Sequence, residues 1–81
     1  MFIVYVLKSE VAKKSYVGIT DSLARRLEQH NKGKSFYTKR YKPWKLIYKE
    51  EFLGRNEARK REKYFKSASG RRYLRKNIFK E

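Results

Sequence analysis

The hydrophobic positions of the chain begin as strand-like runs. Phe2–Leu7 (FIVYVL) is a continuous run of β-branched and aromatic residues, which is typical of a strand buried on both faces. Ser15–Ile19 (SYVGI) resumes this pattern after a connecting loop, so we expect the two runs to form an antiparallel hairpin. A third strand is predicted over Trp44–Phe52, with four apolar residues sharing one face: Trp44, Leu46, Tyr48 and Phe52.

Helical spacing appears between the second and the third of these runs. Two leucines placed four residues apart predict an amphipathic helix from about Ser22 to Asn31. Thr20 or Asp21 is the expected N-cap, because short polar side chains satisfy the first free N–H groups of a helix. Gly33 is placed to end this helix.

The C-terminal half of the chain is predicted to be mostly helical. A long helix begins near Asn56 and is expected to stop at Gly70, and a short closing helix follows in the tail. The resulting order is β-β-α-β-α-α. It predicts a single α+β domain over residues 1–81, in which helices flank a three-stranded, mainly antiparallel sheet.

Charge is the strongest signal in the composition. The chain carries 23 Lys and Arg against 8 Asp and Glu, a formal net charge of +15 on 81 residues. A folded domain this basic repels itself, so we favour a polyanionic partner, namely nucleic acid, over an anionic membrane or a charge without specific meaning. Disulfides and thiolate metal sites are excluded because the chain has no cysteine.

The same sequence gives no membrane signal. No apolar run approaches the roughly 18 residues that a membrane-spanning helix needs. The first ten residues, MFIVYVLKSE, lack the basic start and small-residue cleavage site of a signal peptide. We therefore expect a cytoplasmic protein without a membrane partner.

Three polar residues are predicted to face the sheet rather than solvent. At 100° per residue, Arg26 and His30 border the leucine stripe of the first helix, whereas Arg25 and Gln29 point away. On the second helix, Glu62 shares a face with the apolar residues. An unpaired carboxylate there costs several kcal/mol, so Glu62 needs a cation, which could be Arg26, Lys66 or a metal ion. The residues alone leave a structural ion pair and a functional site both open.

Two short motifs resemble those of the GIY-YIG nuclease family. Ile3–Tyr5 (IVY) resembles the GIY element, although Ile3 stands where the motif has Gly, and Tyr16–Gly18 (YVG) resembles the YIG element. The two tyrosines are 16 − 5 = 11 positions apart, which fits the spacing of the family. The chain is similar to the small stand-alone members, which resemble the N-terminal nuclease domain of the excision-repair nuclease.

The helical segments continue this resemblance. LARRLEQHNKGK resembles the helix with the essential Arg of the family, matched here by Arg26, and His30 matches a position where many members carry His. EARKREKYFK resembles the helix with the metal-binding Glu, matched by Glu62. Some relatives also use a late Asn, for which Asn77 is a weak match.

The resemblance implies an endonuclease that hydrolyses DNA phosphodiester bonds with Mg²⁺ or Mn²⁺, on branched, nicked or damaged DNA in repair or recombination. Glu62 would bind the metal, Arg26 would bind phosphate oxygens, and His30 would hydrogen-bond a tyrosine or orient the water. Tyr16 is the expected general base and Tyr5 would position it, although the sequence does not separate these two roles. The alternative is a catalytically silent nucleic-acid-binding module.

The loop over residues 31–43 is the predicted DNA-facing surface. Its basic residues can neutralise phosphates, and its aromatic residues can stack on unpaired bases or pack on the sheet instead. The predicted nucleic-acid-binding residues are Lys32, Lys34, Tyr37, Lys39, Arg40 and Lys42. Because a domain of this size leaves little room for specificity elements, a protein partner or self-association is expected to supply them.

Overall fold

A computed structural model describes residues 1–34 and 36–80 of the chain. The strands are β1 (Phe2–Ser9), β2 (Ser15–Thr20) and β3 (Trp44–Phe52). The helices are α1 (Leu23–Asn31), the 3-10 helix η1 (Thr38–Arg40), α2 (Arg55–Lys66), α3 (Ala68–Tyr73) and the π-helix η2 (Leu74–Phe79). The strands form one antiparallel sheet in the order β2-β1-β3. The α+β fold and the order β-β-α-β-α-α are therefore confirmed.

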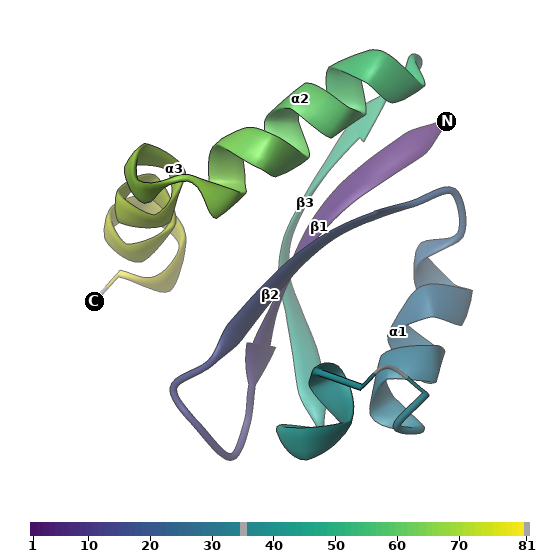
Figure 1. Ribbon diagram of the computed structural model, residues 1–81, viewed down its shortest axis with the longest axis vertical. Coiled ribbons are helices and arrows are strands. Elements are labelled where there is room, and N and C mark those ends of the chain that lie inside the picture. The colour runs from purple at the N-terminus through teal and green to yellow at the C-terminus, as the bar shows by residue number, and fades with distance from the viewer. Residues whose placement is uncertain (35, 81) are drawn as a thin grey trace.

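The sheet lies between two helical layers. In Figure 1, α1 and the short helix η1 cover one face of the sheet, while α2 and the C-terminal helices cover the other. The central strand β1 is buried on both sides: Val4 and Val6 face α2, whereas Tyr5 and Leu7 face α1. Its unbroken hydrophobic run has this cause, because alternate side chains enter two different cores.

The prediction for β3 was wrong in one respect. The register with β1 shifts between Val6 and Leu7, so that Val6 pairs with Tyr48 and Leu7 with Leu46. This β-bulge inserts Ile47 and switches the faces of the strand. Leu46 consequently packs in the core under α1, and Tyr48 packs in the core under α2. The apolar residues of β3 thus serve both layers instead of sharing one face.

The ends of α1 follow local backbone chemistry. Ser22 is the N-cap in place of the predicted Thr20 or Asp21, and its side chain makes no capping hydrogen bond. Thr20 instead accepts a hydrogen bond from the N–H of Ser22 at 3.0 Å, which shapes the turn before the helix. Gly33 ends α1 as predicted: its φ of +78° belongs to the left-handed region that favours glycine.

Gly70 does not stop the second helix. The helix breaks at Ser67, whose backbone is extended and whose hydroxyl accepts a hydrogen bond from Gly70 N–H at 3.2 Å, so that α3 begins. Gly70 is buried inside α3. A Cβ at this position would meet the carbonyl of Tyr64 and would lie 2.6 Å from the Cα of Phe65. Glycine is required here by the close approach of two helix backbones.

No helix within the described ranges has both the length and the apolar character to cross a membrane.

Candidate active site

Tyr5 and Gly18 face each other across two neighbouring strands. They are direct partners in the β1–β2 register, and the ring of Tyr5 lies over the position that a side chain at Gly18 would fill. A Cβ there would be 2.6 Å from Cζ of Tyr5 and 2.9 Å from Cε2 of Tyr16. Neither a bulge nor a crowded turn therefore explains this glycine, which makes room for two tyrosine rings on the edge strand.

The hydroxyl of Tyr5 begins a buried chain of polar contacts. Tyr5 is 1% exposed, and its hydroxyl lies 2.9 Å from Nε2 of His30, which is fully buried. The other ring nitrogen of His30, Nδ1, lies 2.8 Å from Oγ1 of Thr38, also fully buried. Burial and then the positive charge of Arg26 lower the pKa of His30 to about 4. The imidazole is consequently neutral at pH 7, with one donor and one acceptor nitrogen.

Arg26 determines the direction of this hydrogen-bond chain. Its guanidinium only donates and interacts with the hydroxyl oxygens of Tyr5 and Tyr16. The proton of Tyr5 is therefore directed to Nε2 of His30, which leaves Nδ1–H to donate to Thr38. Burial raises the pKa of Tyr5 to about 12 although Arg26 opposes the change, so Tyr5 is a neutral phenol at pH 7.

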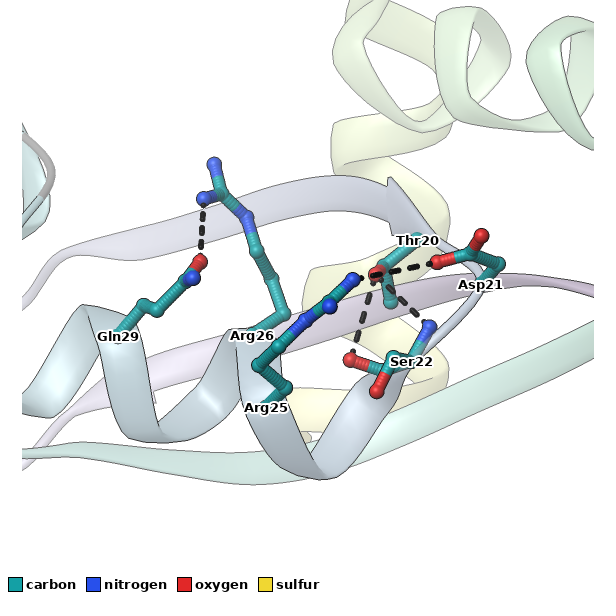
Figure 2. Close-up of polar contacts among 6 residues, drawn as sticks. All are labelled: Thr20, Asp21, Ser22, Arg25, Arg26 and Gln29. Carbon is teal, nitrogen blue, oxygen red and sulfur yellow. Dashed lines mark hydrogen bonds and ion pairs between the residues drawn. The ribbon is translucent and has the colours of Figure 1, made fainter.

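Arg26 and Arg25 occupy different sides of α1, as the helical geometry predicted. Figure 2 shows Arg25 directed toward Asp21, at 3.7 Å, whereas Arg26 is directed toward Gln29. Nη1 of Arg26 donates to Oε1 of Gln29 at 3.0 Å. Burial lowers the pKa of Arg26, but its contacts with Tyr5 and Tyr16 outweigh burial and raise it. The guanidinium is a fixed positive charge over the two tyrosines.

Tyr16 is the tyrosine that solvent reaches. It is half-buried on the edge strand β2, and its ring lies 4.8 Å from that of His30 and 6.2 Å from that of Tyr5. It also lines an open groove of about 580 Å³, which Tyr5 does not. Four of the predicted site residues, namely Tyr5, Tyr16, Arg26 and His30, are thus brought together on the α1 face of the sheet.

Glu62 approaches this cluster from the opposite layer. Its side chain is 14% exposed on α2, and Oε2 lies 3.2 Å from Nζ of Lys66, one of the two structural partners considered from the sequence. Arg61, its neighbour, binds Glu50 through two hydrogen bonds of 2.8 and 3.1 Å. The charge of Glu62 contributes to the raised pKa of Tyr5, which indicates that the carboxylate acts across the sheet on the tyrosine cluster.

The predicted DNA-facing loop joins the site through one residue. The ring of Tyr37 lies 6.0 Å from that of Tyr16, 5.6 Å from Tyr41 and 6.3 Å from Trp44, and Tyr37 remains 41% exposed. The basic residues of the loop are exposed beyond this aromatic cluster: Lys32, Lys34, Lys39, Arg40 and Lys42. Lys32 forms an ion pair with Glu28 at 2.6 Å. Residue 35 of this loop lies outside the described part of the chain.

Sequence reasoning missed two residues of the site and overvalued one. Thr38 was counted only as part of a loop, although it holds His30, and Gln29 was expected to point to solvent. The spacing of Gln29 three residues after Arg26 is a signal that could have found it, because such residues are neighbours on a helix. Asn77, the weak candidate, is exposed on η2 and donates a hydrogen bond to the carbonyl of Tyr73.

Comparison with known proteins gives one family. The GIY-YIG catalytic domain matches residues 1–76. A UPF0213 protein of Pediococcus pentosaceus is 39% identical over 80 residues, covering 94% of this chain and 83% of that protein. One from Clostridium perfringens is 41% identical over 64 residues (78% and 68%), and YazA of Bacillus subtilis is 44% identical over 52 residues (63% and 52%). This last match therefore spans about half the length of YazA.

A solved structure supports the same grouping. The solution NMR structure of a UPF0213 protein from Bacillus halodurans has a TM-score of 0.56 and 29% sequence identity to this chain. The similarity covers 91% of this chain and 82% of the other.

Proposed function

Because the chain belongs to the GIY-YIG family, we propose that it is a metal-dependent endonuclease that hydrolyses DNA phosphodiester bonds. The observation that carries the proposal is a solvent-accessible tyrosine, Tyr16, beside a fixed guanidinium, Arg26. Beneath them, the buried chain from Tyr5 through His30 to Thr38 holds the geometry. The net charge of +15 supplies the attraction for a polyanionic substrate.

Tyr16 is the general base in this proposal. A base must lie within hydrogen-bond reach of the attacking water, and Tyr16 lines the open groove whereas Tyr5 is 1% exposed. Burial also raises the pKa of Tyr5 to about 12, which opposes its loss of a proton. Tyr5 is therefore a positioning residue, and its hydroxyl keeps His30 and Arg26 in place.

Arg26 has two tasks in the reaction. It stabilises negative charge on the Tyr16 oxygen as that oxygen takes the proton of water, and it donates to the phosphate oxygens as their charge grows. A planar guanidinium offers several donors for both, and it stays charged at any working pH. Gln29 limits its rotation through the 3.0 Å hydrogen bond.

Glu62 is the residue that would hold a divalent cation. The described residues contain no group of three or more His, Cys, Asp or Glu suited to enclose a metal ion. Mg²⁺ is nevertheless commonly held by one or two carboxylates together with water and substrate phosphates. Glu62 fits that role, because the half-buried carboxylate already has a cation, the Lys66 ammonium, at 3.2 Å. A bound Mg²⁺ or Mn²⁺ would act as a Lewis acid on the phosphate and stabilise the leaving 3′ oxygen.

Cleavage of labelled DNA in Mg²⁺ and in EDTA tests this proposal. Duplex, nicked, flapped and four-way-junction substrates are compared for the wild type and for Glu62→Gln, Arg26→Ala and Tyr16→Phe. We expect each variant to lose roughly 10²-fold or more of the Mg²⁺-dependent rate while retaining DNA binding. Glu57→Gln is the matched control, since Glu57 is an exposed acid on the same helix.

The two tyrosines separate in the same assay. Tyr16→Phe removes the base, whereas Tyr5→Phe removes one hydrogen bond of the support and is expected to reduce the rate less. A wild type that binds every substrate and cuts none in Mg²⁺ or Mn²⁺ would refute the enzyme and leave a silent binding module. Repair or recombination of DNA is the process in which such an activity would act.

A further inference from the structure

We propose that the groove beside Tyr16 binds an unpaired DNA strand that continues from the cleavage site, which makes DNA with a single-stranded arm the preferred substrate. The groove has a volume of about 580 Å³ and lies between the β1–β2 hairpin and the C-terminal helices α3 and η2. These two parts of the molecule lie on the same side in Figure 1. The inference rests on the proposed nuclease function and adds a substrate class to it.

The groove is connected to both halves of the candidate active site. Tyr16 lines one end of it, and Lys66, which also lines it, forms the 3.2 Å ion pair with Glu62. A strand cut between Tyr16 and Glu62 would therefore find the groove directly beside the scissile phosphate. The basic loop of residues 31–43 lies on the α1 side, so the groove is a second and separate basic surface.

The charge of the groove suits a phosphate backbone. Six of the lining residues are basic, and none of the described lining residues is acidic. They come from both walls: Lys8, Lys13 and Lys14 from the hairpin, and Lys66, Arg71 and Arg75 from the helical side. Charges of one sign around a concave surface focus the potential and attract a polyanion.

Several of these side chains are exposed at the groove. Lys13, Arg71 and Arg75 are exposed and have no ion pair within the described parts of the chain. Lys14 lies over the ring of Tyr41, 5.7 Å from its centroid, a contact that leaves its charge uncompensated. These cations repel each other in the free protein, and a bound phosphate backbone would relieve that repulsion.

Aromatic surface at the groove favours unpaired bases. Tyr37 also lines the groove, is 41% exposed, and is supported by rings of Tyr16, Tyr41 and Trp44 at 5.6–6.3 Å. A rigid ring of this kind is a stacking platform, and base stacking combined with a basic groove is typical of single-strand binding. Paired bases are already stacked on each other and offer no face to such a ring.

The size of the groove also excludes a duplex. Sites of roughly 300–1,000 Å³ hold a molecule of the size of a drug, which corresponds to about one or two nucleotides. The major groove of a duplex alone is about 12 Å wide, so that a whole duplex needs an extended surface rather than a groove of this volume. One strand fits where two do not.

The test compares two double variants that remove the same charge. Arg71→Gln with Arg75→Gln removes two exposed groove cations, and Lys60→Gln with Lys63→Gln removes two exposed lysines of α2 that do not line the groove. Binding of fluorescein-labelled DNA is followed by anisotropy in EDTA between 50 and 200 mM salt, so it does not depend on cleavage. One probe carries a ten-nucleotide 5′ or 3′ flap, and the other is a blunt duplex of equal length.

We expect the wild type to prefer the flap, and the arginine variant to lose that preference. Two phosphate contacts on a single strand change the salt slope by about 1.4, which corresponds to a loss on the order of 20-fold at 0.1 M salt. The lysine variant should stay close to the wild type. Lys13→Gln, on the opposite wall, provides an independent reading with about half the change in slope. Circular dichroism confirms that each variant is folded.

The outcomes separate this inference from the proposed function. Equal losses in the two double variants would show that only net charge matters and would overturn the groove. Equal losses on flap and duplex would overturn the unpaired strand. If either result is found while the wild type still cuts DNA in Mg²⁺, the nuclease stands without the groove. A wild type that binds neither probe would refute both.

Discussion

Acidification should destabilise this protein through a single residue. His30 is the only histidine of the chain, is fully buried and has its pKa lowered to about 4 by burial and by the charge of Arg26. In the unfolded chain its pKa returns to about 6.5. Between these values the unfolded state binds a proton that the folded state does not, so the free energy of unfolding falls as the pH falls.

The magnitude follows from the two pKa values. Stability from this group is fully present above pH 6.5 and is lost progressively as the pH drops toward 4. From pH 6.5 to 5.0, about 1.5 pKa units at about 1.36 kcal/mol each give a loss of about 2 kcal/mol. Most carboxylates titrate below this range, so the histidine is the main contributor there. A loss of this size is a substantial fraction of the roughly 5–15 kcal/mol typical of a folded domain.

Urea unfolding at pH 7.5 and pH 5.0, followed by the fluorescence of the single tryptophan, Trp44, measures this loss. The control is His30→Gln, which keeps a polar side chain beside Tyr5 and Thr38 but does not titrate. Its stability should change little between the two pH values. The pKa itself is read by NMR from the one imidazole in the chain. An imidazole that titrates near 6.5 in the folded protein, or an equal loss in His30→Gln, would refute the reasoning.

Three further predictions concern close contacts. Gly18→Ala should destabilise the protein by about 1–3 kcal/mol and abolish cleavage, because its Cβ would displace the ring of Tyr5; thermal melting and the nuclease assay measure both effects. Gly70→Ala should lower the melting temperature further, because its Cβ would strike rigid helix backbone; a substitution without effect would refute that contact. Trp44→Phe should cost about 1–3 kcal/mol in urea unfolding, because it leaves the buried carbonyl of Thr38 without the 2.7 Å hydrogen bond from Nε1.

Patterns with a strict period allowed most of the fold to be predicted. The three strands, the first helix and the inward side of Arg26 all follow from spacing, because side-chain direction repeats every 2 residues in a strand and every 3.6 in a helix. Burial of β1 on both faces followed equally well from the continuous run Phe2–Leu7. These predictions depend only on local geometry.

The errors occurred where tertiary contact overrides the period. The bulge at Ile47 carries no local signal, and it is stabilised only because each half of β3 enters a different core. Gly70 has the sequence signal of a helix end, yet it is selected by the backbone of α2 packed against it. The burial of Thr38 likewise depends on His30, eight residues away, and on Trp44. A sequence read one segment at a time does not contain these pairings.

The position of the candidate site follows from the sheet order. Residues of opposite layers are separated by a sheet everywhere except at its edges, and β2 is an edge strand. Tyr16 and Gly18 lie on that strand, Arg26 belongs to the helix on one side of it, and Glu62 to the helix on the other. The edge is therefore where a guanidinium of one layer and a carboxylate of the other can act on the same phosphate.

This geometry also gives a route for the substrate. The basic loop lies in the α1 layer and the basic groove lies against the C-terminal helices, with Tyr16 and Tyr37 between them. A DNA molecule held by its duplex at the loop would have to cross the edge of β2 to reach the groove. Only one strand would fit beyond that point, so the junction of paired and unpaired DNA would come to lie over Tyr16. If so, the fold itself selects where the cut is made, and the flap and the duplex should differ in the position of cleavage as well as in affinity.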